Sequence, residues 1–100
     1  MMYFVEMTAA FDRWIRSVKS LESRARIIGR IDHIRFGHFG DFKPLGGDLF
    51  ELRFFFGPGF RVYYTIRGDR VVFLLHGGDK SRQERDIEKA REILAGLEDK

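Results

Sequence analysis

Two arginines, one in each arm, interrupt the apolar pattern of the segment Glu51–Tyr64, whose sequence is ELRFFFGPGFRVYY. Runs of aromatic and β-branched residues flank Gly57-Pro58-Gly59, and this pattern predicts a β-hairpin. Because strand side chains alternate between two faces, Arg53, Arg61 and Tyr63 are expected on one face of the hairpin. A phosphodiester is the anion that such a face would suit, since guanidinium binds phosphate through two parallel hydrogen bonds.

The strand that follows the hairpin extends this face. We expect Phe56 to pair with Phe60 across the first turn, and Gly68-Asp69 to form a second tight turn before a strand Val71–His76. Pairing Ile66 with Val71 places His76 opposite Arg61 on the arginine face. The apolar face then gathers Phe50, Leu52, Phe54, Phe56, Phe60, Val62, Tyr64, Ile66, Val71, Phe73 and Leu75.

This constellation suits RNA cleavage without a metal. RNA carries its own nucleophile, the 2′-hydroxyl, so a protein needs to orient it, stabilise the phosphorane and move two protons. Arg53 and Arg61 would hold the phosphate, and His76 would act as acid or base because histidine can exchange a proton in the physiological pH range, with Tyr63 as a weaker candidate. Lys80, beyond the last strand, would neutralise the leaving oxygen. The product would be a 2′,3′-cyclic phosphate.

Each of these residues has a simpler interpretation. Arg53 and Arg61 can form ordinary salt bridges with Glu51 or another exposed carboxylate, and Tyr63 can be a packing residue with a wet hydroxyl. His76 can be a hydrogen-bonded residue at a strand end. Because both arginines lie on strands of the exposed face, we expect them to be surface positions whose removal costs little stability.

The rest of the chain predicts the elements that position the hairpin. Met1–Glu6 is β-prone, and Thr8 is a suitable N-cap for a helix with inward residues Phe11, Trp14, Ile15 and Val18. A second helix from about Glu22 to Arg35, capped by Ser20 or Ser23, would expose a basic ridge of Arg26, Arg30 and His33. Lys43 falls in the glycine-rich segment 37–48, expected to be a loop. Gly77–Lys80 should form a turn before a last helix capped by Ser81.

Size and composition describe one domain, residues 1–100, of the α+β class in the order β-α-α-β-β-β-α. The net charge is +3 and the basic excess lies between Arg13 and Arg70, which favours a polyanionic partner such as nucleic acid. The three histidines show no metal-ligand spacing and no cysteine is present, so no cofactor is expected. No segment has the pattern of a membrane helix or signal peptide, and we expect a cytoplasmic protein.

Several motifs in fixed order resemble the addiction-module killer proteins of the RelE/ParE toxin superfamily, in particular its HigB-like, phage-Gp49-like branch. They are GDFKPLG, ELR, GPGFRVYY and GGDKS, and the likeness runs from Phe11 to about Leu94. The resemblance implies two N-terminal helices packed on an antiparallel meander sheet and a bacterial type II toxin. It also implies a small antitoxin partner, with a helix-turn-helix antitoxin expected, and mRNA cleavage on the ribosome. Arg53 and Arg61 match the basic residues on the central strands that hold the scissile phosphate in that family, and Lys80 matches a basic residue after the last strand.

The resemblance leaves other functions open. Several ribonuclease relatives use a tyrosine or histidine in or near the C-terminal helix, whereas the segment Asp86–Lys100 has neither. The ParE branch has the same fold and poisons DNA gyrase instead of cutting RNA. A third possibility is a catalytically degenerate domain that only binds the antitoxin. Under the ribonuclease hypothesis the basic ridge and Lys43 would contact RNA.

Overall fold

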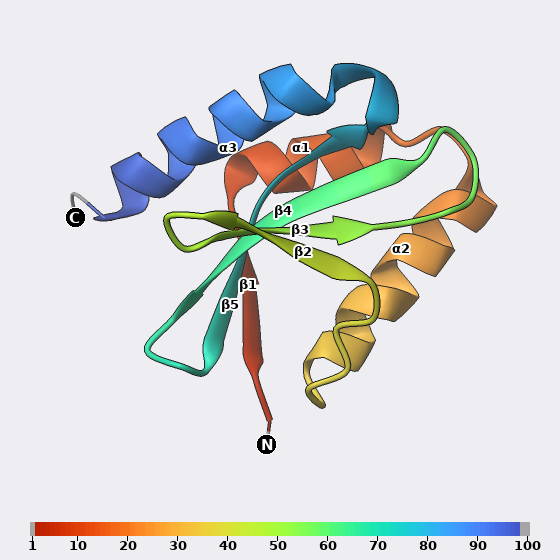
Figure 1. The fold of residues 1–100 in the computed structure, drawn as a ribbon. Helices are drawn as coiled ribbons and strands as arrows, with labels where there is room; N and C mark the ends of the chain where they lie inside the picture. Colours follow the sequence, from red (N-terminus) through yellow and green to blue (C-terminus); the bar gives the residue numbers. More distant parts are fainter. Residues whose placement is uncertain (1, 99–100) are drawn as a thin grey trace.

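The structure is a computed structural model that describes residues 2–98, with the side chain of residue 98 excluded. Figure 1 shows the elements in chain order. They are β1 (Phe4–Met7), α1 (Ala9–Ser17), α2 (Leu21–Ile34), β2 (Phe42–Gly46), β3 (Leu49–Arg53), β4 (Phe60–Arg67), β5 (Val71–Asp79), the short 3₁₀ helix η1 (Lys80–Arg82) and α3 (Gln83–Glu98). Met1, which the prediction included in the first strand, lies outside the described residues.

The strands form one mixed sheet in the order β1-β5-β4-β3-β2. Strands β2 to β5 make an antiparallel meander, and β1 pairs in parallel with β5 at the edge. The predicted α+β class, with two N-terminal helices on a meander and a C-terminal helix, is confirmed. The prediction of a loop over residues 37–48 is wrong in part, because β2 occupies Phe42–Gly46 and carries Lys43.

Local sequence explains where the first two helices begin. The hydroxyl of Thr8 accepts a hydrogen bond from the Phe11 amide at 3.1 Å, and that of Ser20 accepts one from the Ser23 amide at 3.1 Å. Each bond satisfies an amide that has no partner inside its helix. The apolar stripes of both helices then face the sheet, and they bury Phe11, Ile15, Ile27, Ile31 and Ile34.

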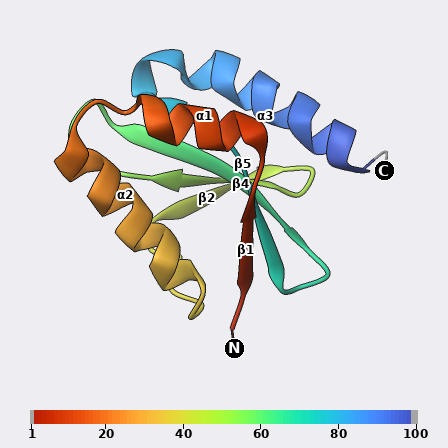
Figure 2. The same cartoon turned by 180° about the vertical axis from the view of Figure 1, so that it is seen from behind.

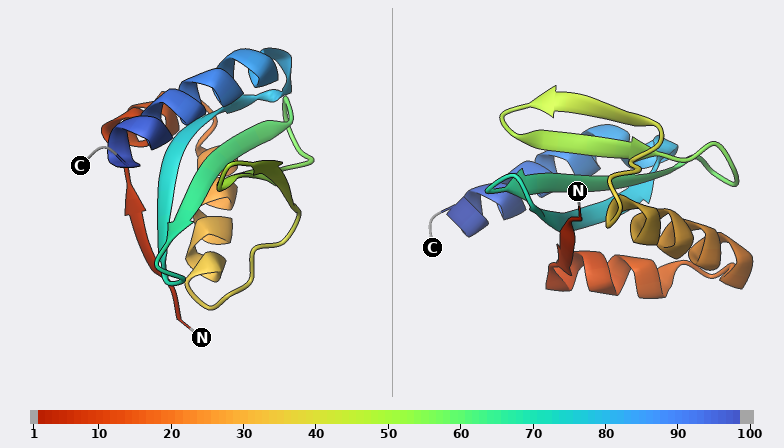
Figure 3. Two further views of the ribbon diagram at one scale, coloured as in Figure 1. Left: turned by 60° about the vertical axis from the view of Figure 1, so that its left-hand side comes forward. Right: turned by 90° about the horizontal axis from the view of Figure 1, so that it is seen from below.

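The sheet separates two apolar cores. Helices α1 and α2 cover one face, as Figures 2 and 3 show, and their side chains pack with Leu52, Phe54, Val62 and Tyr64. Helix α3 covers the other face, where Ala90 and Leu94 pack with Leu49, Tyr63 and Leu75. The prediction recognised only the first core, and the second one covers part of the expected arginine face.

The strand registers differ from the predicted ones. Arg53 lies opposite Arg61, a shift of two residues that leaves every side chain of the hairpin on its predicted face. Strand β5 is shifted by one residue, so Val72 and Leu74 enter the first core in place of Val71, Phe73 and Leu75. Phe73 and Leu75 face α3 because the second core requires apolar side chains there.

A bulge in β5 then restores the predicted orientation of His76. Leu74 lies opposite Tyr64 and His76 lies opposite Tyr63, which leaves Leu75 as the extra residue. His76 therefore shares a face with Arg61 as predicted, but its direct neighbour is Tyr63.

The predicted turn at Gly77–Lys80 is also wrong, because β5 continues to Asp79. The Asp79 carboxylate accepts a hydrogen bond from the Ser81 amide at 2.8 Å, so it caps η1 in place of Ser81. Helix α3 starts at Gln83. Among the described residues, no helix combines the length and apolar character needed to cross a membrane.

Candidate active site

A pocket of about 320 Å³ opens at the tip of the β3–β4 hairpin, and we call it the tip pocket. Its lining comprises Phe54, Phe55, Gly57, Pro58, Gly59, Arg61 and Lys80. Strand β4 supplies Arg61, and Lys80 enters from the first residue of η1. Gly59 has a φ of 77°, and a Cβ there would lie 3.3 Å from the Cβ of Lys80 and 3.6 Å from Nη1 of Arg61. A glycine therefore both permits this turn and keeps the two cations accessible.

Arg61 is held more firmly than a surface arginine. Its Nη1 donates hydrogen bonds to the carbonyl oxygens of Gly59 at 3.0 Å and Phe60 at 3.1 Å. Its Nε lies 3.9 Å from Oε1 of Glu51, and only 8% of the Arg61 side chain is exposed. The expectation that Arg61 is a surface position is therefore wrong, although it lines the tip pocket.

Behind Arg61 lies a buried polar cluster beneath the start of α3. Glu51 is fully buried and accepts a hydrogen bond from Nε2 of Gln83 at 2.8 Å. Burial raises the pKa of Tyr63 far above its ordinary value, and the charges of Glu51 and Asp86 raise it further. Tyr63 therefore stays protonated at neutral pH and does not line the tip pocket, which makes it unsuited to act as a general base.

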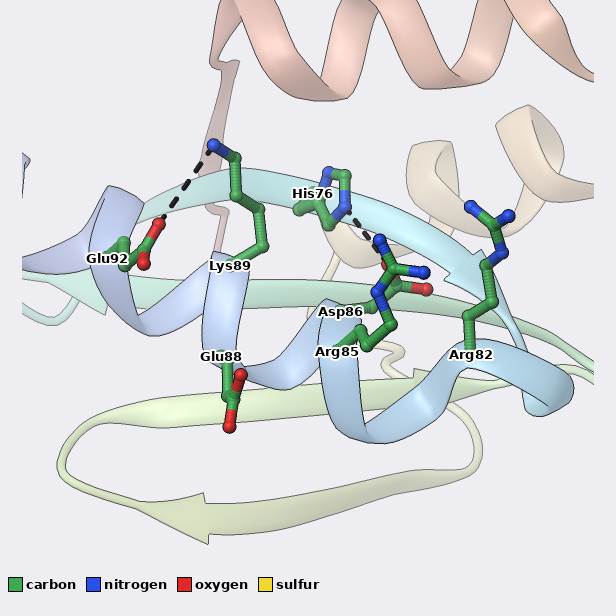
Figure 4. Close-up of a pocket in the computed structure, with 7 residues that line it drawn as sticks. All are labelled: His76, Arg82, Arg85, Asp86, Glu88, Lys89 and Glu92. Carbon is green, nitrogen blue, oxygen red and sulfur yellow. Dashed lines mark hydrogen bonds and ion pairs between the residues drawn. The ribbon is translucent and has the colours of Figure 1, made fainter.

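His76 lies in a different pocket, between β5 and α3 (Figure 4). Its Nε2 is 3.3 Å from Oδ1 of Asp86, and its Nδ1 is buried without a hydrogen-bond partner. The other residues that line this pocket of about 350 Å³ are Arg82, Arg85, Glu88, Lys89 and Glu92. His76 thus shares a sheet face with Arg61 but not a pocket, because the first turns of α3 cover the surface between them.

Arg53 occupies the open part of the same face, directly opposite Arg61. Its Nε lies 3.3 Å from Oδ2 of Asp41, and the two side chains are 36% and 35% exposed. Both arginines therefore have a carboxylate neighbour, as the simpler interpretation proposed. The Asp41 pair is accessible to solvent and can exchange partners, whereas the Glu51 pair is buried.

The predicted basic ridge on α2 is not continuous. Arg30 donates to the carbonyl oxygens of Phe39, Asp41 and Arg53, and burial lowers its pKa from the ordinary value. The prediction that Arg30 projects into solvent is therefore wrong, because the side chain binds α2 to the segment before β2 and to the end of β3.

The other three predicted RNA contacts remain accessible. Arg26 is exposed, and its guanidinium stacks over the Phe56 ring, 3.8 Å from the ring centroid. His33 is exposed on α2, and Lys43 is exposed on β2 opposite Glu51. Among residues 2–98, no group of three histidine or acidic side chains is placed to hold a metal ion.

Sequence reasoning missed three residues around this site. Gln83 and Asp86 are one helical turn apart and contact Glu51 and His76, respectively. Their i, i+3 spacing at the start of the last helix was a signal that both could face the sheet. Phe55 was also missed, although it lies two residues after Arg53 and therefore falls on the arginine face.

The free form of an Escherichia coli RelE toxin mutant has a closely similar fold. The TM-score is 0.74, and the match covers 92% of this chain and 97% of that chain. The sequences are 18% identical, so the likeness shows the fold alone. Two helices on one face of the meander, with a third helix over the other, therefore define a RelE-like fold.

The family follows from sequence. Residues 13–95 match the phage-derived proteins described as Gp49-like, and the chain belongs to this family. An uncharacterised protein of Haemophilus influenzae is 42% identical over 93 residues, which span 93% of this chain and 94% of that protein.

Proposed function

We propose that this protein is the toxin of a bacterial type II toxin–antitoxin module and that it cleaves ribosome-bound mRNA. The observation that carries the proposal is the convergence of Arg61 and Lys80 on one open pocket. A family of phage-derived proteins and a RelE-like fold support the toxin class. The antitoxin, a small helix-turn-helix protein, would lay an acidic or amphipathic segment over the tip pocket and mask it.

The tip pocket would bind the scissile phosphate of single-stranded RNA. Arg61 is fixed by its hydrogen bonds to the turn, so it offers a preorganised positive charge to the phosphorane. The 2′-hydroxyl oxygen would form a bond to the phosphorus and lose its proton to solvent, while the bond from phosphorus to the 5′-oxygen breaks. Lys80 would stabilise the departing 5′-oxygen and donate a proton to it. Arg53 would exchange Asp41 for a phosphate oxygen of the adjacent nucleotide, and the product would be a 2′,3′-cyclic phosphate.

The RNA-binding surface would extend from this pocket along the hairpin. Arg26 lies over Phe56 of the same hairpin, and Lys43 projects from β2. Together with His33 they provide accessible positive or ionisable groups for contacts with ribosomal RNA. Arg30 would contribute indirectly, by fixing the segment before β2.

Removal of the Lys80 ammonium should lower the rate of mRNA cleavage by about a hundredfold, the scale of losing one electrostatic contact in a transition state. The measurement is primer extension on cellular mRNA after brief induction without the antitoxin. Lys80 is exposed, so Lys80→Ala should fold normally. Lys89→Ala is the matched control, because Lys89 is an exposed lysine of α3 outside the tip pocket. Cleavage by Lys80→Ala at the wild-type rate would contradict the proposal.

One observation favours a second candidate, a toxin that does not cut RNA. The described residues that line the tip pocket include no histidine, tyrosine or carboxylate, so Lys80 is the one side chain there suited to proton transfer. A ParE-like poison of DNA gyrase needs no such group. Loss of supercoiling with intact mRNA after induction of the wild-type protein would establish this alternative. An absence of any growth defect would indicate a degenerate domain that only binds the antitoxin.

A further inference from the structure

Phe55 is the most exposed large apolar side chain among residues 2–98, at 78% exposure. It follows strand β3 and belongs to the lining of the tip pocket, together with Arg61 and Lys80. The Arg53 guanidinium lies 5.8 Å from the centroid of the Phe55 ring. An aromatic ring that joins neither core thus lies near Arg53 and shares a pocket with Arg61 and Lys80.

Its neighbour in the chain shows that this exposure is specific to Phe55. Phe54 is buried in the core beneath α2, and the Arg30 guanidinium lies 4.5 Å from its ring centroid. Phe55 points to the opposite face because strand side chains alternate. That face is covered by α3 farther along the sheet but is open at the hairpin tip, so nothing in the fold requires an apolar residue at this position.

We propose that Phe55 is a stacking platform for a nucleobase of single-stranded RNA. This inference rests on the proposed function and adds to it the subsite beside the scissile phosphate. Proteins that bind single strands combine aromatic faces, on which bases stack, with a cationic groove that follows the phosphates. The base would lie on the Phe55 ring while its phosphates contact Arg61, Lys80 and Arg53.

The surroundings of Phe55 favour a nucleobase over a protein partner. Sites for protein partners are marked by contiguous apolar surface. The other exposed large apolar side chains lie near the N-terminus, on α2 or just after it, or on β2, and none of them lines the tip pocket: Met2, Phe4, Met7, Leu21, Ile28, Phe36 and Phe42. A single ring bordered by cations matches one planar base joined to negative phosphates.

The test compares RNA with and without bases. Binding of the full-length protein to a fluorescent RNA hexamer is measured by anisotropy. The hexamer carries 2′-O-methyl groups, which prevent its cleavage. Phe55→Ala should weaken binding about tenfold, within the range measured for stacking of one base, and Phe55→Trp should restore it. With a hexamer of abasic residues, the wild type and Phe55→Ala should bind equally.

Phe36→Ala is the matched control, because Phe36 is 58% exposed and lies beyond the end of α2. It should bind the hexamer as tightly as the wild type. Equal binding of the hexamer by Phe55→Ala and wild type would overturn the stacking proposal, as would an equal loss on the abasic hexamer. If the wild-type protein cleaved no mRNA in cells while Phe55→Ala still weakened binding of the hexamer, the ribonuclease proposal would be refuted and the stacking proposal would stand.

Discussion

At the residue scale, Arg61 has both a structural and a proposed functional role. It offers charge to the tip pocket and also lies next to the fully buried carboxylate of Glu51. A buried carboxylate that loses its cation costs much more free energy than an exposed one. Loss of activity in an Arg61 variant therefore has to be separated from loss of fold.

Arg61→Ala should lower the free energy of unfolding by about 3 kcal/mol, because it leaves Glu51 buried without a neighbouring positive charge. Adding Glu51→Gln should recover most of this loss, and urea unfolding measures both effects. Arg53→Ala is the control: its pair with Asp41 is about one-third exposed, so the cost should stay below about 1 kcal/mol. An unchanged urea midpoint for Arg61→Ala would show that Glu51 does not depend on this arginine.

The sequence was sufficient to place the candidate cations but not their environment. Alternation along the hairpin put Arg53, Arg61 and Tyr63 on one face, and the strand register agrees. Whether that face is open depends on α3, which starts more than twenty residues after Arg61 in the chain. Because the prediction did not include this cover, it placed Tyr63 and His76 beside the phosphate. In the structure both lie beneath α3 instead.

At the element scale, strand β5 allows helices to approach the sheet from both sides. A Cβ on Gly77 would collide with the indole ring of Trp14 in α1, and one on Gly78 would collide with the Asp86 carboxylate in α3. Consecutive strand residues face opposite ways, so two adjacent glycines serve two helices. The Gly-Gly pair was interpreted from sequence as a turn, because a turn is the commoner use of such a pair.

Gly77→Ala should therefore destabilise the protein by about 1–3 kcal/mol, the usual cost of overpacking a buried site. Gly29→Ala, in the middle of α2, meets no atom within 4 Å and should stabilise it by about 0.5–1 kcal/mol. The measurement is the free energy of unfolding in urea. If Gly77→Ala were as stable as the wild type, α1 would not be packed closely on β5.

At the scale of the whole molecule, the sheet separates two cores and contributes side chains to both of them. Tyr63 and Tyr64 are adjacent in β4, and each is buried in a different core. Burial raises the pKa of both hydroxyls above their ordinary value of 10.0. The folded state therefore holds these protons at a pH where the unfolded chain releases them.

Stability should be independent of these tyrosines below about pH 10 and should fall as the pH rises above it. The slope should be at most about 1.4 kcal/mol per pH unit for each tyrosine. Urea unfolding between pH 8 and 11 measures it, and Tyr63→Phe should reduce the slope because phenylalanine has no proton to lose. A Tyr63→Phe slope equal to that of the wild type would contradict the assignment.

The sequence by itself determined the first two helices with their caps and the alternation within the hairpin, because these depend on neighbours a few residues apart. It also carried the family, through motifs in a fixed order. Only the tertiary structure decided that β2 and β1 complete the sheet, that β5 is shifted by one residue, and that α3 covers His76 and Tyr63. These features depend on contacts between distant segments, where a second core competes for the same side chains. They leave Arg53, Arg61 and Lys80 in the open part of the candidate site, where Phe55 joins them.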